Sequence, residues 1–317
     1  MRFLGAALVD GRYEARLIEA PPPVPGPGEV LVRVAASGVN RADLSQIAGR
    51  YPPPPGESEI LGLEVSGTVV ESGKKVCALV AGGGHAEFAA VPRGQLLPVP
   101  SRVDLLEAAA IPEAFLTAYL NLAIEGELPR GDRVLVHAGA SGVGLAAIQI
   151  ARYLGARVAA TTRSASKLAA LRENGADPAI DSSAEPFAEA IERAWGPGAV
   201  DVVLDPIGAG TLAGDLRVLA TGRRIIFLAT MSGARAELDI ALLMRKGGRL
   251  IGSTLRSRSR EEKARLVERF ATDILPGFES GAVSPSVDTV FPAARAAEAL
   301  TRMAENRNVG KILLDWS

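Results

Sequence analysis

The sequence contains very few of the side chains that bind soft metals or form disulfides. It has one cysteine, Cys77, and two histidines, His85 and His137, among 317 residues. A single cysteine excludes an intrachain disulfide, and these three side chains are too few for a typical zinc site. We therefore expect no bound metal. Cys77 is expected to be an ordinary strand residue, with a reactive thiol as the alternative.

An excess of positive charge and long apolar runs are also absent. Lys and Arg total 35 against 36 Asp and Glu, which gives a formal net charge of -1. Nothing offsets phosphate repulsion along a nucleic acid, so nucleic-acid binding is not expected as the main function. Asp10, Arg12 and Glu14 interrupt the N-terminal apolar run, and no later stretch approaches the ~20 residues of a membrane span. We expect a cytoplasmic protein that does not bind membranes.

The length and the pattern of the chain favour two domains, with a cleft between them as the first place to expect a site. Short β segments broken by turn residues fill the first part, for example VLVRVAASGVN and HAEFAAVP, and predict a mostly antiparallel domain. From about Leu105 apolar residues recur at helical spacing in LLEAAAIPEAFLTAYLNLAI, and alternating strand and helix patterns follow. These alternating patterns predict βαβ units and a parallel sheet with helices on both faces.

After RLIGSTLRS the sequence shows no further βαβ rhythm, so the end of the chain is expected to rejoin the first domain. The predicted fold class is α/β. A mostly antiparallel β catalytic domain is expected over 1–115 and 258–317, and a doubly wound Rossmann domain for the cofactor over 116–257.

A glycine-rich turn marks the predicted dinucleotide site. It stands between the apolar strand VLVHA and a helix beginning near Leu145, and consists of Gly139, Ala140, Ser141, Gly142, Val143 and Gly144. The glycines allow a tight turn, close approach of the backbone to a pyrophosphate, and close packing of helix on strand. The helix N-terminus then faces the phosphates. A glycine turn without a ligand is the alternative.

The end of the second predicted strand indicates which nicotinamide cofactor is bound. NAD-selective sites carry an acid there, about 20 residues after the glycine turn. This chain has Thr162, Arg163 and Ser164 instead, with Lys167 one helical turn further. These groups suit a 2′-phosphate and predict NADPH, with a solvated helix start as the alternative. Asp205, which ends the next strand pattern, is either a pocket residue or a turn acid, and the sequence does not separate the two.

Several motifs together resemble the zinc-free quinone oxidoreductases of the medium-chain dehydrogenase/reductase superfamily, the zeta-crystallin-like group. They are, in chain order, ASGVNRADLSQIAGRYPPPP, LGLEVSG, GHAEFAAVP, AAAIPEAFLTAY, GDRVLVHAGASGVGLAAIQIAR, LRSRS and NVGKILL. LRSRS, ILPGF and NRNVGKI are most similar to the stress-inducible NADPH quinone oxidoreductase branch. The resemblance implies a GroES-like catalytic domain together with the Rossmann domain. It also implies a homodimer, which the apolar segments RRIIFLAT and RLIGSTL at a predicted sheet edge favour independently.

Active-site residues are implied by the same resemblance. Asn40 and Leu63 stand where the zinc alcohol dehydrogenases have a Cys and a His ligand, which again predicts no metal. Asn40 and Tyr51 are expected to line the nicotinamide end of the cleft, with Asp43 nearby. Arg256 and the tail are expected to close it, the tail residues being Asn308, Gly310 and Lys311.

Each of these residues also has an ordinary structural interpretation. Asn40 could be a turn residue, Asp43 the N-cap of the short helix DLSQIAG, and Lys311 a surface charge. The chain also departs from the family. Ser45 and Ser182 stand where relatives have tyrosines, at the acceptor pocket and by the 2′-phosphate respectively, and the segment between ESG and KKVCALV is shorter than usual.

The resulting hypothesis is NADPH-dependent reduction of a quinone or another conjugated carbonyl by hydride transfer. Reduction of a 2-enoyl thioester or enone, or an NADPH-binding role without turnover, are the alternatives. Neither histidine lies near the Asn40 or Tyr51 motifs in the sequence, and no residue stands out as a general acid. We therefore expect catalysis to come mainly from positioning the two π systems, since orientation alone can supply ~7–11 kcal/mol.

Overall fold

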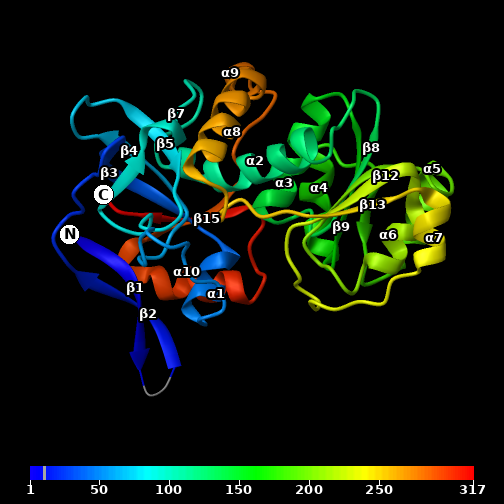
Figure 1. The fold of residues 1–317 in the computed structure, drawn as a ribbon, viewed down its shortest axis with the longest axis horizontal. Coiled ribbons are helices and arrows are strands. Elements are labelled where there is room, and N and C mark those ends of the chain that lie inside the picture. Colours follow the sequence, from blue (N-terminus) through cyan, green and yellow to red (C-terminus); the bar gives the residue numbers. More distant parts are fainter. Residues whose placement is uncertain (10–11) are drawn as a thin grey trace. The chain divides into compact units, whose positions relative to one another are not determined.

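A computed structural model describes residues 1–9 and 12–317, so Asp10 lies outside the described residues. The chain divides into two units (Figure 1). Unit 1 consists of Met1–Leu116 and Leu255–Ser317, and unit 2 of Thr117–Thr254. Unit 1 contains a mostly antiparallel sheet and unit 2 a parallel sheet, which confirms the predicted α/β fold class.

The main sheet of unit 1 has the strand order β14-β15-β3-β4-β5-β7, with β6 also pairing with β3. Only β14 and β15 pair in parallel among these strands of the described chain. A separate antiparallel hairpin joins β1 to β2. The strands are β1 (Arg2–Val9), β2 (Arg12–Glu19), β3 (Glu29–Val39), β4 (Glu64–Val69), β5 (Lys75–Leu79), β6 (Phe88–Pro92), β7 (Leu96–Pro98), β14 (Val287–Pro292) and β15 (Lys311–Asp315).

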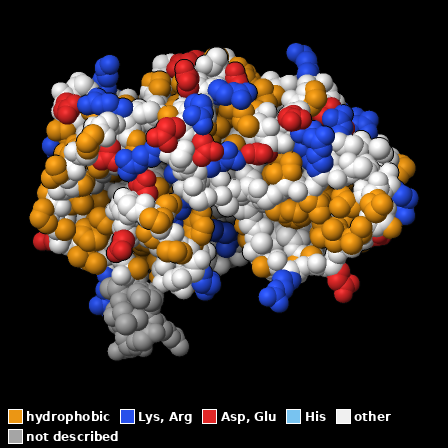
Figure 2. Space-filling model, in the orientation of Figure 1, with side chains coloured by type: hydrophobic (Ala, Val, Ile, Leu, Met, Phe, Trp, Pro, Cys, Tyr) orange, Lys and Arg blue, Asp and Glu red, His pale blue; other side chains and the backbone are white. Residues whose placement is uncertain are grey.

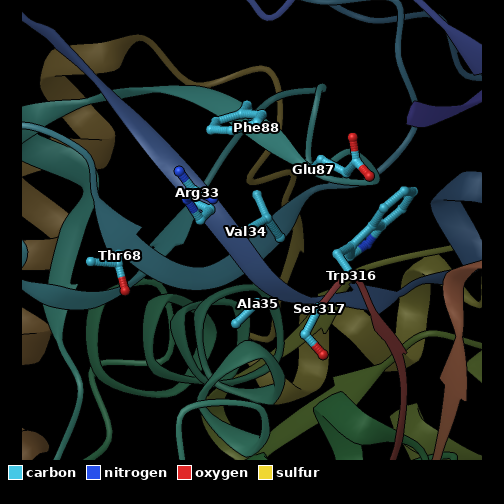
Figure 3. A pocket seen from close by; sticks show the side chains of 8 residues that line it. All are labelled: Arg33, Val34, Ala35, Thr68, Glu87, Phe88, Trp316 and Ser317. Carbon is cyan, nitrogen blue, oxygen red and sulfur yellow. The ribbon is translucent and has the colours of Figure 1, made fainter. Parts of the chain in front are cut away.

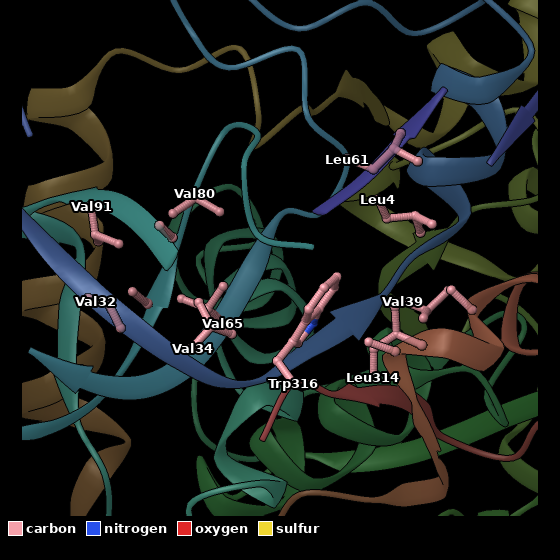
Figure 4. Packing of buried hydrophobic residues seen from close by; sticks show 14 of the residues in the cluster. Leu4, Val32, Val34, Val39, Leu61, Val65, Val80, Val91, Leu314 and Trp316 are labelled. Carbon is pink, nitrogen blue, oxygen red and sulfur yellow. The ribbon is translucent and has the colours of Figure 1, made fainter. Parts of the chain in front are cut away.

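Alternation along β3 explains how this sheet forms its core. Val30, Val32 and Val34 are buried, and the residues between them are more exposed, as the period of two in a strand requires. These valines pack in one cluster with residues from the rest of the unit, including Leu314 of β15 and Trp316 directly after this strand (Figure 4). The core of unit 1 therefore combines the first and last parts of the chain.

The C-terminal part of unit 1 corrects one expectation. A βαβ unit does follow RLIGSTLRS, because β14, α10 (Ala296–Ala304) and β15 are consecutive and the two strands are parallel. Strand β14 is half-exposed and ends in proline, so its sequence lacks the apolar run of an internal parallel strand. The other helices assigned to this part are α8 (Arg260–Asp273) and α9 (Leu275–Ser280).

The segment predicted as one helical stretch after Leu105 is divided. It consists of a 3₁₀ turn over Glu107–Ala110, helix α2 (Pro112–Tyr119) and a π-helical turn over Leu120–Ile124. Pro112 opens α2, where a missing N–H costs no hydrogen bond, so the break falls in front of it. The short segment between ESG and KKVCALV forms a tight hairpin, in which the Val69 N–H donates to Lys74 O (2.9 Å).

Unit 2 is described over its whole length and contains a sheet of six parallel strands in the order β10-β9-β8-β11-β12-β13. This order reverses at the first strand, β8, as in dinucleotide-binding doubly wound folds. The edge strand β13 and its neighbour β12 correspond to RLIGSTL and RRIIFLAT. The elements are β8 (Arg133–Val136), α3 (Gly142–Tyr153), β9 (Arg157–Thr162), α4 (Leu168–Glu173), β10 (Ala179–Asp181), α5 (Phe187–Trp195), β11 (Val200–Asp205), α6 (Leu212–Val218), β12 (Leu219–Phe227), α7 (Ile240–Lys246) and β13 (Arg249–Gly252).

Candidate functional site

The glycine-rich turn of unit 2 connects β8 to α3. Ser141 is the N-cap of α3, and its Oγ accepts the Gly144 N–H at 3.0 Å. A Cβ at Gly144 would lie 2.5 Å from the Ala138 carbonyl oxygen, so only glycine allows the helix to approach the turn this closely. The Gly139 N–H donates to Thr161 O (2.8 Å), which attaches the turn to β9.

The turn has the donors that a pyrophosphate requires. The first N–H groups of a helix have no partner within it, and Ser141 caps only that of Gly144. The N–H groups of Gly142 and Val143 thus remain at the positive end of the α3 dipole, and both residues are half-exposed. The turn therefore fits the phosphates of a dinucleotide.

The end of β9 is next to this turn, and no acid occupies it. Thr162 is buried, whereas Arg163 directly after it is exposed. The neighbouring Ser182 donates from its N–H to Thr162 O (2.8 Å), and lies at the same edge of the sheet. Asp181 pairs with Thr162 in register, but its carboxylate accepts both the N–H (2.9 Å) and the hydroxyl (2.6 Å) of Ser183.

Directly after Arg163, the Ser164 hydroxyl lies 2.9 Å from the Ser166 hydroxyl. Lys167 ends the short 3₁₀ turn that follows. An exposed guanidinium among hydroxyl groups is suited to an anionic group.

A sealed group of polar side chains lies in unit 2, and we call it the His137 cluster: His137, Thr161, Asp205, Thr211 and Asp215. His137 Nε2 is 2.8 Å from Asp215 Oδ1, and its Nδ1 is 2.9 Å from Thr161 Oγ1. Burial opposes protonation of His137, but the charges of Asp215 and Asp205 outweigh it and raise the pKa of this imidazole. Burial also raises the pKa of Asp215, although His137 opposes that shift.

The position of Asp205 favours the turn interpretation over the pocket interpretation. Its carboxylate is fully buried and accepts the N–H groups of Ile207 (2.5 Å) and Gly208 (3.1 Å). The Thr211 hydroxyl donates to the same carboxylate at 2.8 Å. Asp205 therefore stabilises the turn between β11 and α6.

Unit 1 contains a second polar group, the Asn40 cluster: Asn40, Asp43, Glu64, Glu113 and Lys311. Asn40 is the N-cap of α1 (Arg41–Ile47). Asp43 is not the N-cap, as the alternative interpretation had it, because the helix begins two residues before it. Its carboxylate instead accepts the Asn40 N–H at 2.7 Å, as part of a capping box.

Glu64 is the centre of this cluster, although the sequence analysis did not select it. It is fully buried on β4, and its Oε1 accepts from Lys311 Nζ (2.5 Å) and Asn40 Nδ2 (3.0 Å). Lys311 also donates to Asn40 Oδ1 (2.6 Å) and Val39 O (3.0 Å), and is 4% exposed. Lys311 is therefore not a surface charge. Glu64 is the single charged residue in the mostly apolar segment LGLEVSG, and this was the signal that could have identified it.

A buried histidine also joins the cluster, contrary to the expectation from sequence distance. His85 Nε2 lies 3.2 Å from Asp43 Oδ2, and its Nδ1 lies 2.7 Å from Ser37 Oγ. The Trp316 indole N–H donates to the same hydroxyl at 2.8 Å. The sequence separation of 42 residues concealed this contact. Burial by itself raises the pKa of Asp43, but His85, the Asn40 N–H and Lys311 together lower it.

Glu113 is a further residue that the sequence analysis missed. It lies in the first turn of α2, and its N–H donates to Glu64 Oε2 at 2.8 Å. Its side chain is half-buried. Burial raises the pKa of the Glu113 carboxyl to about 8, with the charges of Glu64 and Asp43 acting in the same direction and Lys311 opposing them.

Tyr51 and Arg256 lie together in unit 1. The Arg256 guanidinium carbon lies 5.0 Å from the centre of the Tyr51 ring, and Nη1 donates to Tyr51 O (3.0 Å). Its other donors bind Ala81 O (2.8 Å) and Gln46 Oε1 (2.7 Å), and the residue is 4% exposed. Arg256 thus fixes the Tyr51 segment, and the Tyr51 side chain is half-buried. Burial and the charge of Glu113 raise the pKa of Tyr51, and Arg256 opposes the shift.

Asn308 and Gly310 shape the turn that leads into Lys311. The Asn308 side-chain amide donates to Gly310 O at 2.7 Å. Gly310 has φ of +85°, and a Cβ there would lie 2.3 Å from Ser286 O, so this turn requires glycine. The two residues therefore place Lys311 at the start of β15.

Other features of the described residues, 1–9 and 12–317, bear on metals and pockets. No three His, Cys, Asp or Glu side chains within them are grouped to hold a metal. Cys77 is buried in β5, where burial raises the pKa of its thiol. A pocket of about 400 Å³ in unit 1 contains none of the predicted site residues; it is lined by Arg33, Val34, Ala35, Thr68, Glu87, Phe88, Trp316 and Ser317 (Figure 3).

Two family models match the chain. The alcohol dehydrogenase GroES-like domain matches residues 26–101, and the zinc-binding dehydrogenase model matches residues 142–272. Among solved structures, the quinone oxidoreductase of Thermus thermophilus, determined also with NADPH, is 34% identical. The match covers 99% of this chain and 100% of that one, with a TM-score of 0.85. The chain belongs to the quinone oxidoreductase-like family of the medium-chain dehydrogenase/reductase superfamily.

Other proteins similar to this chain carry different functional names. Human synaptic vesicle membrane protein VAT-1 homolog is 32% identical, over 93% of this chain and 81% of that protein. The solved JamJ enoyl reductase is 26% identical, over 99% and 98% of the two chains, with a TM-score of 0.85. The coarse assignment common to the family, a nicotinamide-dependent oxidoreductase, holds for this chain. No helix of the described residues has the length and apolar character needed to cross a membrane.

Proposed function

We propose that this protein uses NADPH to reduce quinones or similar conjugated carbonyl compounds in the cytoplasm, without a metal. The observation that carries the proposal is the end of β9, where Arg163 and its neighbouring hydroxyl groups follow the strand that binds the glycine-rich turn through the Gly139 N–H. This arrangement favours the additional 2′-phosphate of NADPH. When bound, NADPH supplies a hydride.

The residues of unit 1 support a conjugated acceptor. Asn40 and Leu63 provide an amide and an alkyl group, neither of which is a zinc ligand, so the acceptor must take hydride without Lewis-acid help. Quinones and enones delocalise the incoming charge over their conjugated system. The Tyr51 ring, held by Arg256, is a flat surface on which such an acceptor can stack.

The similarity to the JamJ enoyl reductase favours a second candidate, reduction of a 2-enoyl thioester. A turnover assay with NADPH against quinones, enones and enoyl thioesters separates the two. We expect quinones to give the highest kcat/KM. Faster turnover of enoyl thioesters would support the second candidate, and cofactor binding without turnover of any acceptor would indicate a binding role. Elemental analysis of the active protein should find no stoichiometric zinc.

We also propose a homodimer joined at β13. This strand pairs only with β12 in the described structure, and its half-exposed Leu250 and Ile251 leave an apolar edge. Hydrophobic side chains also gather over the adjoining α7, where Ile240 is 62% and Met244 75% exposed (Figure 2). Light scattering at micromolar concentration should give twice the chain mass. A monomer alone would contradict this.

A further inference from the structure

Reduction of a carbonyl acceptor requires a proton as well as a hydride, so the possible donors in unit 1 can be compared. The described polar hydrogens of the Asn40 cluster are mostly engaged. Lys311 directs its ammonium group to Glu64, Asn40 and the Val39 carbonyl. The Asn40 amide donates to Gly38 O and Glu64 Oε1, each at 3.0 Å. Neither group has a hydrogen left for a substrate.

The two other buried cations of unit 1, Arg256 and Lys263, are only 4% and 2% exposed. Arg256 donates to Ala81, Tyr51 and Gln46, as described above, and Lys263 Nζ donates to Arg256 O at 2.7 Å. Asp43 is buried and accepts hydrogen bonds from Asn40 and Gly62. Two half-exposed O–H acids remain beside the cluster in the described structure, the phenol of Tyr51 and the carboxyl group of Glu113.

We propose that Glu113 is the general acid that protonates the acceptor oxygen, an inference that rests on the proposed function. Its backbone is fixed by Glu64, and no hydrogen bond or ion pair within residues 1–9 and 12–317 engages its carboxyl group. Its partial exposure leaves it open both to an acceptor and to water.

The charges around Glu113 keep the proton in place. The groups acting on it come from several elements: Glu64 of β4, Asp43 of α1, Lys311 of β15, Lys263 of α8, and Tyr51 and Arg256. A pKa of about 8 leaves the carboxyl mostly protonated at neutral pH, yet acidic enough to transfer its proton. The pKa of Tyr51 is raised above its usual value, which makes the phenol the poorer donor.

Atoms and electrons balance in this step. A bound reduced nicotinamide would supply the hydride, two electrons and one hydrogen nucleus, to the conjugated acceptor and would thereby be oxidised. The acceptor oxygen that gains negative charge forms a new O–H bond as the Glu113 Oε–H bond breaks. Water then returns a proton to the Glu113 carboxylate, so each turnover consumes one proton from solvent.

The test measures quinone reduction against pH in the wild type, Glu113→Gln and Glu113→Asp. Turnover of the wild type should fall as pH rises through about 8, because the acid form is lost. Glu113→Gln should lose roughly a hundredfold or more in kcat, while its NADPH dissociation constant stays unchanged. Glu113→Asp should restore part of the rate. Wild-type kcat and an unchanged pH profile in Glu113→Gln would overturn the proposal.

A second measurement does not depend on turnover or on the folding of a variant. Infrared difference spectroscopy of wild-type protein labelled with ¹³C-glutamate should show a protonated carboxyl band at neutral pH that disappears near pH 8. Its absence would refute the assignment. A wild type that reduces none of the acceptors would refute the proposed function, whereas an active wild type with an unaffected Glu113→Gln variant would refute only the role of Glu113.

Discussion

The two polar clusters of this protein use the same kinds of side chain but differ in exposure. In the His137 cluster of unit 2, every member is at most 9% exposed, and the acids bind a histidine, the Thr211 hydroxyl and backbone N–H groups. In the Asn40 cluster of unit 1, Glu64, Asp43 and Lys311 are equally buried, but Asn40 and Glu113 remain half-exposed.

This difference separates structural from chemical roles. A buried acid whose oxygens accept several hydrogen bonds stabilises the fold and cannot reach a substrate. A half-exposed acid held against another carboxylate keeps a proton and can transfer it. On this account the His137 cluster stabilises the fold of unit 2. In the Asn40 cluster, the buried Glu64–Lys311 ion pair holds one reactive carboxyl group, that of Glu113, in place.

The largest predicted effect, on the free energy of unfolding, comes from breaking the buried Glu64–Lys311 ion pair. Lys311→Met leaves the carboxylate of Glu64 buried without its cation, which should lower the free energy of unfolding by ~3–5 kcal/mol. Urea denaturation followed by fluorescence measures this. The exposed Lys74→Met serves as the matched control, with a change within about 0.5 kcal/mol. Equal stabilities of the two variants would contradict the account of Lys311.

A smaller effect is expected on cofactor affinity. Arg163→Ala removes one charge-assisted contact to the 2′-phosphate and should weaken NADPH binding by ~1.5–3 kcal/mol, roughly tenfold to hundredfold. NADH affinity should not change. Titration calorimetry checks both, with the exposed Arg172→Ala on α4 as control. Equal affinities of the native protein for NADPH and NADH would remove the basis of the cofactor preference.

Tyr51 should show a smaller effect again. Tyr51→Ala removes the stacking surface and should lower kcat/KM for quinones by about tenfold, since such contacts contribute ~0.5–1.5 kcal/mol. NADPH binding should be little affected. Tyr51→Phe retains the ring and should be mild. If steady-state kinetics show Tyr51→Phe to be as impaired as Tyr51→Ala, the hydroxyl rather than Glu113 donates the proton.

The smallest effect on quinone turnover is expected from a change in the buried His137 cluster. His137→Gln keeps a polar side chain beside Asp215 but removes the imidazole, and should reduce thermal stability. The pH at which quinone turnover falls should stay that of the wild type, because His137 is expected to take no part in proton transfer. A displaced pH profile in the folded variant would mean that the two clusters are not functionally distinct.

Local patterns allowed much of the fold and part of the candidate site to be predicted. The alternation of strands and helices predicted the parallel sheet, and the spacing of Gly139, Ser141 and Gly144 between strand and helix predicted the turn. Glu64, His85 and Glu113 were missed for a physical reason. Their roles depend on burial and on partners 24 or more residues away, which periodicity does not encode.

The βαβ unit near the end of the chain was missed for a related reason. Its strand β14 is an exposed edge strand, so its residues do not form the apolar run by which a parallel strand is recognised. Asp205 shows that a position at the end of a parallel strand does not by itself identify a cofactor-binding residue. It stands at the strand end where cofactors bind, yet its carboxylate is buried and hydrogen-bonded to the turn that follows.

The central claim is that NADPH bound by this protein is oxidised by a conjugated carbonyl compound. Stopped-flow mixing of the protein and NADPH with a quinone, followed by the absorbance of the reduced nicotinamide, tests it directly. We predict rapid oxidation of one equivalent of NADPH per equivalent of quinone, with a rate that falls above about pH 8. NADPH that binds but is not oxidised by quinones, enones or enoyl thioesters would contradict the claim.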